Sequence, residues 1–245
     1  MKANLHTHST YCDGKNSIEE MVRAAIAKGY DILGFSSHMA SPVKYDCEVE
    51  PAKYMDYVRE VRTAARKYAD KIHVFCGVEA DFIPGVTTPD YARYADLKLD
   101  YIIGSVHYVL APDGALVSVD NTPEILREGI KAHFNNDARA YVEAYFRQQT
   151  DMLKYDFDVV GHPDLVRKFN EKFPYFDEQA DWYLKCRRDF AAELARSKKL
   201  TEVNTGGIAR GWLTTPYPSP DFQTELEALG VPMIHSLDAH SAEQL

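Results

Sequence analysis

The chain has 245 residues, of which 45% are hydrophobic and 27% are charged. These values are close to those of globular domains, and they exclude a disordered or fibrous chain. The formal net charge of -9 at pH 7 argues against long nucleic acid as a partner, because an acidic surface repels phosphate chains.

The four cysteines lie far apart and form no Cys-x-x-Cys motif, so neither a disulfide scaffold nor a zinc ribbon is indicated. The N-terminus lacks the apolar centre of a secretory signal, and no segment approaches the roughly 18 apolar residues of a membrane span. We therefore expect a cytoplasmic protein without a membrane partner. The pattern carries no signal for the oligomeric state.

Short apolar runs alternate with segments of helical periodicity, which is typical of repeated β-α units around a parallel sheet. The first helix is predicted from Ser17, which forms a capping box with Glu20, to a stop at Gly29. Further helices are expected at 51–68, 138–153, 177–197 and 220–230. The predicted strands are 3–5, 32–36, 73–78, 101–105, 159–161, 200–204 and 233–236.

No linker or repeat divides the chain, so we interpret residues 1–245 as one domain. Residues 111–136 are rich in Pro, Gly and Asn, and we expect an irregular insertion above the sheet there. Seven β-α units favour a closed or nearly closed barrel over an open doubly wound sheet, because a barrel has no edge strands to protect.

Six of the nine histidines follow predicted strands, and carboxylates occur at the same places. In a β/α barrel all strand carboxyl ends open onto one face, so these side chains are expected to converge. Neutral imidazoles together with carboxylates favour a divalent metal site over a set of unrelated structural histidines. The residues concerned are His6, His8, Asp13, His38, Glu79, Asp81, His107, His162, Asp164, Asp238 and His240.

These motifs resemble those of the PHP (polymerase and histidinol phosphatase) superfamily. The matching segments are His6-Thr7-His8 with Asp13, Ser36-Ser37-His38, 77–81, 104–107, 161–164 and 238–240. The resemblance implies an α/β fold, a distorted (β/α)7 TIM-like barrel in a single domain, with a metal site of up to three ions. Residues 202–207 with Arg210, and Tyr217-Pro218-Ser219, resemble the histidinol-phosphatase branch.

The sequence departs from the family pattern at three places. Leu237 interrupts a motif that often reads Gly-Ser-Asp, but the carboxylate of Asp238 is kept. Asn4 stands where an acidic residue is common, which affects the surroundings of the metal ligands and not their number. The chain ends at Leu245, where a final helix is expected to cover the last strand. We therefore expect either a longer natural gene product or a domain that lacks its C-terminal end.

The resemblance implies two or three divalent ions, with zinc, manganese, iron and cobalt all compatible. His6, His8, Glu79 and Asp238 would hold the first ion, Glu79, His107 and His162 the second, and Asp13, His38 and His240 the third. Three ions, three carboxylates and one hydroxide give a formal charge of about +2, opposite to that of a phosphate monoester.

Further residues are predicted to bind the substrate or to protonate its leaving group. Arg210, in a glycine-rich loop, would bind phosphate, although it could also be a solvated surface arginine. Arg167 and Lys168 are second candidates for phosphate, and Asp164, Asp238 or a metal-bound water would give the leaving group its proton. For the organic part of the substrate we favour Tyr217 among the loop residues Tyr11, Tyr45, Asp46, Tyr108 and Tyr217.

The implied function is hydrolysis of a small phosphorylated substrate, L-histidinol phosphate, to L-histidinol and phosphate in histidine biosynthesis. The alternative is a PHP-type phosphodiesterase or nuclease that acts on a small nucleotide or another diester. A non-catalytic scaffold would be expected to lack ligands, and no ligand position is lost here.

Overall fold

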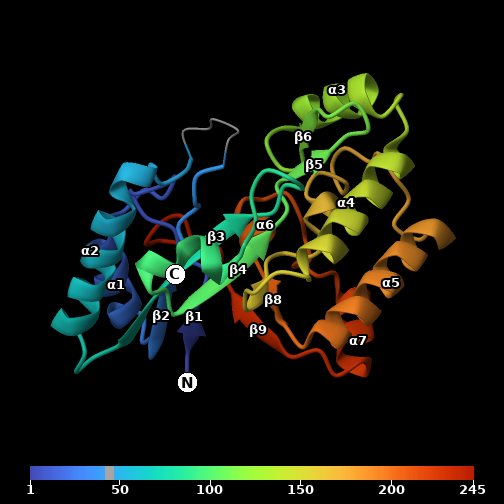
Figure 1. Cartoon of the computed structure of the whole chain (residues 1–245). Helices are drawn as coiled ribbons and strands as arrows, with labels where there is room; N and C mark the ends of the chain where they lie inside the picture. Colours follow the sequence, from blue (N-terminus) through green and yellow to red (C-terminus); the bar gives the residue numbers. More distant parts are fainter. Residues whose placement is uncertain (42–46) are drawn as a thin grey trace.

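Seven parallel strands form the centre of the protein, described by a computed structural model over residues 1–41 and 47–245. The strands pair in the order β1-β2-β3-β4-β7-β8-β9, so each is added beside the preceding one (Figure 1). They span Ala3–Asn4 (β1), Ile32–Phe35 (β2), His73–Asp81 (β3), Tyr101–Ser105 (β4), Val159–Val160 (β7), Leu200–Asn204 (β8) and Met233–Ser236 (β9).

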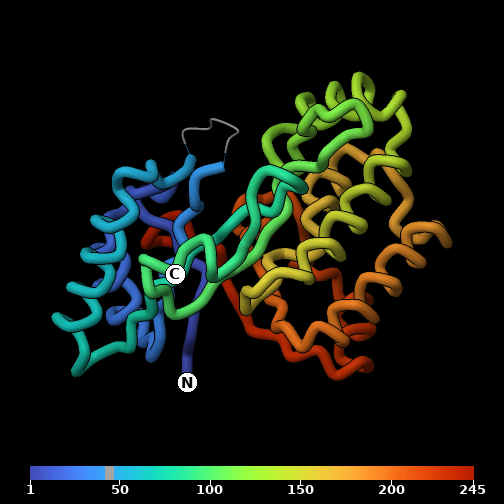
Figure 2. Tube along the Cα trace, viewed as in Figure 1, coloured from blue at the N-terminus to red at the C-terminus, as the bar shows by residue number. Residues whose placement is uncertain are grey.

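The segments that follow the first and last strands of this order meet and close the sheet. The His8 N–H donates to the Ala239 carbonyl at 2.9 Å, and the Ala239 N–H donates to the His6 carbonyl at 3.1 Å. Thr7 and Ala239 thereby form a parallel bridge, and Figure 2 shows the N-terminal segment beside the last part of the chain. The prediction of a distorted (β/α)7 barrel is confirmed.

Helices cover the outside of the barrel. Figure 1 shows α1 (Ile18–Ala27) and α2 (Tyr54–Lys67) on one side, and α4 (Ala138–Met152), α5 (Asp181–Ser197) and α7 (Pro220–Ala228) on the other. The predicted capping box of α1 is present in both directions, which satisfies two backbone donors at its start. In the described part of the chain, no helix is long and apolar enough to cross a bilayer.

The segment 111–136 is more regular than predicted. It contains strand β6 (Leu116–Ser118), which pairs antiparallel with β5 (Tyr108–Leu110), and helix α3 (Pro123–His133). Thr122 caps α3 through the N–H of Ile125, so the proline that we interpreted as a breaker instead opens a helix. Strands of three residues are too short to give a periodic signal.

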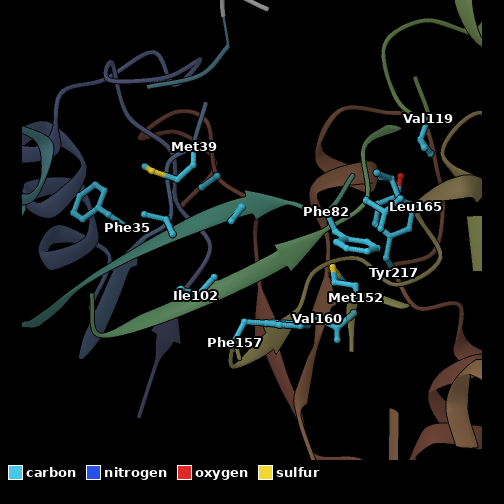
Figure 3. Close-up of a cluster of buried hydrophobic side chains, with 14 of the residues drawn as sticks. Phe35, Met39, Phe82, Ile102, Val119, Met152, Phe157, Val160, Leu165 and Tyr217 are labelled. Atoms are coloured by element: carbon cyan, nitrogen blue, oxygen red, sulfur yellow. The ribbon is translucent and has the colours of Figure 1, made fainter. Parts of the chain in front are cut away.

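The interior of the barrel is filled at the amino ends of the strands. Tyr101 lies there with Ile103 and Val159, and its hydroxyl donates to the Leu5 carbonyl at 2.6 Å. The larger apolar cluster lies between the strands and the helices, and Figure 3 shows part of it. Because the amino end is plugged, the carboxyl ends of the strands provide the open mouth of the barrel.

Shorter helical turns complete the secondary structure. They are the 3-10 turns Pro51–Lys53, Tyr91–Leu97 and Leu165–Arg167, and the single turn α6 (Gly206–Ala209). The turn at Leu165–Arg167 follows β7, and α6 follows β8. Both therefore bring residues to the open end of the barrel.

Candidate metal centre

His6 and His8 leave β1 toward the barrel mouth, and both side chains are fully buried. Their ring centroids lie 5.2 Å apart, as expected for alternate residues of one extended segment. His6 Nε2 is 3.1 Å from Glu79 Oε2, and His8 Nε2 is 3.3 Å from Asp238 Oδ1. Side chains of β1, β3 and the segment after β9 therefore meet at one point.

Glu79, near the end of β3, occupies the middle of the cluster. Each of its two oxygens faces a different set of imidazoles. Around Oε2 lie His6 Nε2 at 3.1 Å, His38 Nδ1 at 3.2 Å and His8 Nε2 at 3.6 Å, and around Oε1 lie His162 Nε2 at 2.9 Å and His107 Nε2 at 3.4 Å. Each oxygen of Glu79 could therefore share a cation with the imidazole nitrogens beside it. This is the arrangement of a carboxylate that bridges two metal ions.

Asp13 lies at the rim of the cluster with His240. The distance from Asp13 Oδ2 to His240 Nε2 is 3.2 Å, and Asp13 Oδ1 is 3.9 Å from His38 Nε2. The rings of His8 and His240 stack at 3.9 Å between centroids. All nine residues predicted as metal ligands are therefore gathered at the mouth of the barrel.

Three groups of these side chains are close enough to hold an ion each. In every group the ligand atoms lie within 4.8 Å of one another. The groups are His8, Asp13, His38 and His240; His6, His8 and Asp238; and His38, Glu79 and His107. Nitrogen and oxygen donors at such spacing are characteristic of divalent transition metals.

Glu79 and His8 have protonation states that fit cation binding. Burial opposes ionisation of Glu79, but His6, His38 and His107 outweigh it and hold its pKa well below the usual value. Burial, reinforced by His240 and His38, lowers the pKa of His8 to about 3, so this imidazole is neutral. Its Nε2 is buried and has no hydrogen-bond partner among the described residues, although Asp238 Oδ1 lies 3.3 Å and Glu79 Oε2 lies 3.6 Å from it. A buried nitrogen lone pair of this kind is suited to a metal ion. Burial opposes protonation of His6, His107 and His240, but neighbouring carboxylates outweigh it and raise their pKa values, so these imidazoles must release a proton to bind an ion.

Three polar side chains outside the nine predicted ligands hold the ligands in place. Asp81 was expected among the converging residues, whereas Ser105 and Glu202 were not predicted as site residues. Asp81 accepts a hydrogen bond from His107 Nδ1 at 2.5 Å, and Ser105 Oγ donates to Glu79 Oε1 at 2.6 Å. Glu202, in the middle of β8, is fully buried and lies 2.9 Å from His6 Nδ1. The sequence signal for Glu202 was a single charged residue in the middle of a strand that is otherwise uncharged.

A cavity of about 230 Å³ opens above the cluster. Lys168 and Arg210 bring positive charge to its wall, and Asp120, from the segment after β6, lies beside Lys168 Nζ at 3.2 Å. Tyr217 also lines the cavity, and within the described chain its buried hydroxyl has no hydrogen-bond partner. Two cations and a free hydroxyl donor thus face the predicted ligands.

Arg210 reaches the cluster directly. Its two terminal nitrogens donate to Asp238 Oδ1 and Oδ2, both at 3.1 Å, and Nη2 lies 2.9 Å from His240 Nδ1. Burial and Arg210 act on Asp238 in opposite directions, and the arginine, with His6, holds the pKa of this carboxyl well below its usual value. Asp238 is therefore ionised, which does not support its predicted role as a proton donor.

Asp164 and Arg167 lie away from the cavity wall. The Arg167 guanidinium is 4% exposed and is occupied by Asp164, Glu178 and Thr215. Asp164 Oδ2 accepts from the Ser219 N–H at 2.8 Å. These contacts show that Asp164 and Arg167 hold together the loops after β7 and β8. They do not support the prediction that Asp164 transfers a proton, nor the prediction that Arg167 binds the substrate.

The other loop residues named for the organic part of the substrate are placed as follows. Tyr11 donates to Glu60 at 2.8 Å, away from the cavity, and Tyr108 lines a small side pocket together with His107. Tyr45 and Asp46 lie outside the described residues.

Fold and site together define a class: a closed β/α barrel with a divalent-metal site at the carboxyl ends of its strands. Residues 4–197 match the sequence model of the PHP domain, so the chain belongs to the PHP domain family.

Relatives over nearly the whole chain refine this result. A probable histidinol-phosphatase of Deinococcus radiodurans is 28% identical, over 96% of this chain and 85% of that protein. A histidinol-phosphatase of Bacillus subtilis is 24% identical, over 98% of this chain and 94% of that protein. The predicted superfamily and its histidinol-phosphatase branch are confirmed.

Two solved structures share the fold. A crystal structure from Listeria monocytogenes, of a protein proposed to be a histidinol phosphatase, has a TM-score of 0.88 at 21% identity. The alignment covers 100% of this chain and 97% of that chain. The histidinol phosphate phosphatase of Lactococcus lactis, crystallised with zinc, L-histidinol and phosphate, has a TM-score of 0.73 at 20% identity. The alignment with the second structure covers 98% of this chain and 87% of that chain.

Proposed function

We propose that the protein is a metal-dependent phosphomonoesterase that hydrolyses L-histidinol phosphate to L-histidinol and phosphate. The observation that carries the proposal is the cluster around Glu79, whose two oxygens face five imidazoles below a cavity with two cationic side chains. Whole-chain relatives named histidinol-phosphatases support the choice of substrate. Free cysteines, as all four are here, agree with action in the cytoplasm.

We assign two or three divalent ions (zinc, manganese, iron or cobalt) to the cluster. His8 and Asp238 lie within reach of His6 and Glu79, which supports one position, and His107 and His162 face the other oxygen of Glu79, which supports a second. The contacts of Asp13, His38 and His240 support a third. Zinc in the Lactococcus lactis enzyme agrees with this class of ion.

When bound, a divalent ion lowers the pKa of coordinated water from 15.7 to about 7 and neutralises charge on phosphoryl oxygens. The chain's own residues supply the rest of the site. Arg210 and Lys168 lie on the cavity wall, where their N–H groups can donate to the phosphate oxygens. Arg210 is paired with Asp238 and Lys168 with Asp120, so the positive charge that attracts an anionic substrate to an acidic protein would come from bound divalent ions together with these two side chains.

Two residues of the cavity keep defined protonation states. Burial raises the pKa of the Tyr217 hydroxyl well above its ordinary value, so this group stays protonated and can donate a hydrogen bond to the substrate. Asp238 stays ionised next to Arg210 and serves as a ligand. The proton for the leaving group is therefore not assigned to either carboxylate that the sequence suggested.

The test compares phosphate release from L-histidinol phosphate with cleavage of bis-p-nitrophenyl phosphate by the same metal-loaded protein. We expect the higher kcat/KM for the monoester, and faster cleavage of the diester would support the phosphodiesterase alternative instead. Glu79→Ala should abolish turnover and reduce bound metal. Wild-type turnover by metal-depleted Glu79→Ala would contradict the metal-dependent reaction.

A further inference from the structure

We propose that Glu202 is a positioning residue that orients two of the metal ligands, His6 and His162. The inference rests on the metal centre proposed above. Glu202 lies on β8, a strand of the barrel that carries none of the nine predicted ligands. It is fully buried and does not line the cavity, so it acts through its neighbours and not on the substrate.

The carboxylate of Glu202 joins four neighbours from four strands and their extensions, its own strand included. Oε2 lies 2.9 Å from His6 Nδ1 and accepts from Ser236 Oγ at 2.5 Å. Oε1 accepts from the backbone N–H of His162 and from Asn204 Nδ2, both at 2.8 Å. A buried carboxylate needs several donors of this kind to offset the loss of water, and here two of them belong to predicted ligand residues.

The contact with His6 fixes which of its nitrogens carries the proton. Nε2 faces Glu79 Oε2 in the ligand cluster, whereas Nδ1 faces Glu202 on the opposite side of the ring. A neutral imidazole that donates from Nδ1 leaves the lone pair of Nε2 free for a cation. Glu202 thus sets both the tautomer and the orientation of His6.

The contact with His162 acts on the backbone. His162 has a φ of 21°, which is unfavourable for a residue with a β carbon. The hydrogen bond from its N–H to Glu202 anchors this turn, and the ring then places Nε2 2.9 Å from Glu79 Oε1. His6 and His162 belong to different proposed metal positions, so one buried glutamate supports two positions.

Replacement by glutamine makes the inference testable, because the shape is kept but one acceptor becomes a donor. The new NH₂ group cannot face His162 N–H or Asn204 Nδ2, which are donors; Asn204 is held in this orientation by the Gly206 N–H on its Oδ1 at 2.7 Å. It must therefore face Ser236 and His6. Ser236 can rotate its hydroxyl to accept, but His6 Nδ1 can accept only if the proton moves to Nε2, which removes the ligand.

The experiment is a Co²⁺ titration of metal-free protein, followed by the d–d absorption of the bound ion and by competition with a chelator. For Glu202→Gln we expect metal binding to weaken by about 10- to 100-fold and the spectrum to change, because a nitrogen ligand is lost. Neither readout depends on turnover.

The matched control is Thr201→Val, the neighbouring residue on β8. Thr201 is also fully buried, and its hydroxyl donates to the Val160 carbonyl of β7 at 3.0 Å, but it contacts no predicted ligand. The control removes a hydrogen bond between β8 and β7, the strand that precedes His162. Because no predicted ligand loses a contact, we expect the titration of Thr201→Val to match that of the wild type.

The outcomes separate the inference from the proposed function. Wild-type protein that takes up no Co²⁺ overturns the metal centre and, with it, this inference. Uptake by the wild type that Glu202→Gln leaves unchanged, or that Thr201→Val weakens equally, overturns the positioning role alone. If Glu202→Gln does not fold, ¹⁵N NMR of the zinc-loaded wild type decides: a proton on His6 Nδ1 supports the inference, and a metal on Nδ1 overturns it.

Discussion

Gly206→Ala tests the packing that holds Asp238 at the ligand cluster. A β carbon built on Gly206 would lie 2.7 Å from Asp238 Oδ2, 2.9 Å from Asp238 Cβ and 2.5 Å from Arg210 Nη1. The long side chain of Arg210 can move aside, but the β carbon of Asp238 is fixed to its backbone. Gly206 does not have a positive φ, so the substitution tests this contact and not backbone strain.

The size of the effect follows from this overlap. Overpacking a buried site by one methyl group costs about 1–3 kcal/mol. For a chain of this length each kcal/mol lowers the melting temperature by about 2–4 °C, so we expect a loss of about 2–12 °C. Because the carboxylate of Asp238 must also shift from His8 Nε2, now 3.3 Å away, metal affinity should fall by about tenfold or more.

The assay is differential scanning fluorimetry of the metal-free protein, together with a metal titration of the variant. Ile208→Ala serves as the control, because Ile208 lies on the same turn, is partly exposed and does not line the cavity. We expect the control to stay within about 0.5 kcal/mol of the wild type. A Gly206→Ala protein with the melting temperature and metal affinity of the wild type would refute the reasoning.

Three further outcomes are expected. Chelation of the metal should lower the melting temperature by about 5–11 °C. One ion at 100 times its Kd, binding only to the folded state, contributes about 2.7 kcal/mol to the free energy of unfolding. An unchanged melting temperature after verified metal removal would count against the site. Tyr101→Phe should cost about 1–3 kcal/mol in urea unfolding, since the Leu5 carbonyl loses its donor inside the barrel; a stability equal to that of the wild type would show that the bond is unimportant. Arg210→Ala should raise the inhibition constant of inorganic phosphate about tenfold or more, as expected for a hydrogen bond to a charged group; unchanged inhibition would place the phosphate elsewhere.

The sequence was most informative where a short strand ends in a histidine or carboxylate. His6, His38 and His107 follow apolar runs that can be recognised locally, and the parallel topology alone then brings them to one face. The capping box at Ser17 was equally local, and its prediction was confirmed. These features depend on neighbours in sequence or on the fold class, both of which a single sequence carries.

Other features depended on contacts between distant segments. The partners of Arg167, among them Glu178 and Thr215, lie on separate loops, so its burial could not be predicted from its position after His162. The positioning contacts of Glu202 join β8 to residues 40 and 196 positions away in the sequence. Strands β5 and β6 are three residues long and become evident only through their pairing.

The central claim is that strand ends from the whole chain enclose several divalent ions, and anomalous X-ray diffraction of crystals of the zinc-loaded protein tests it most directly. We predict anomalous peaks at the zinc edge on both sides of Glu79, with His6 and His8 Nε2 directed at one of them. A map without peaks among these histidines, in protein that elemental analysis shows to contain zinc, would contradict the account.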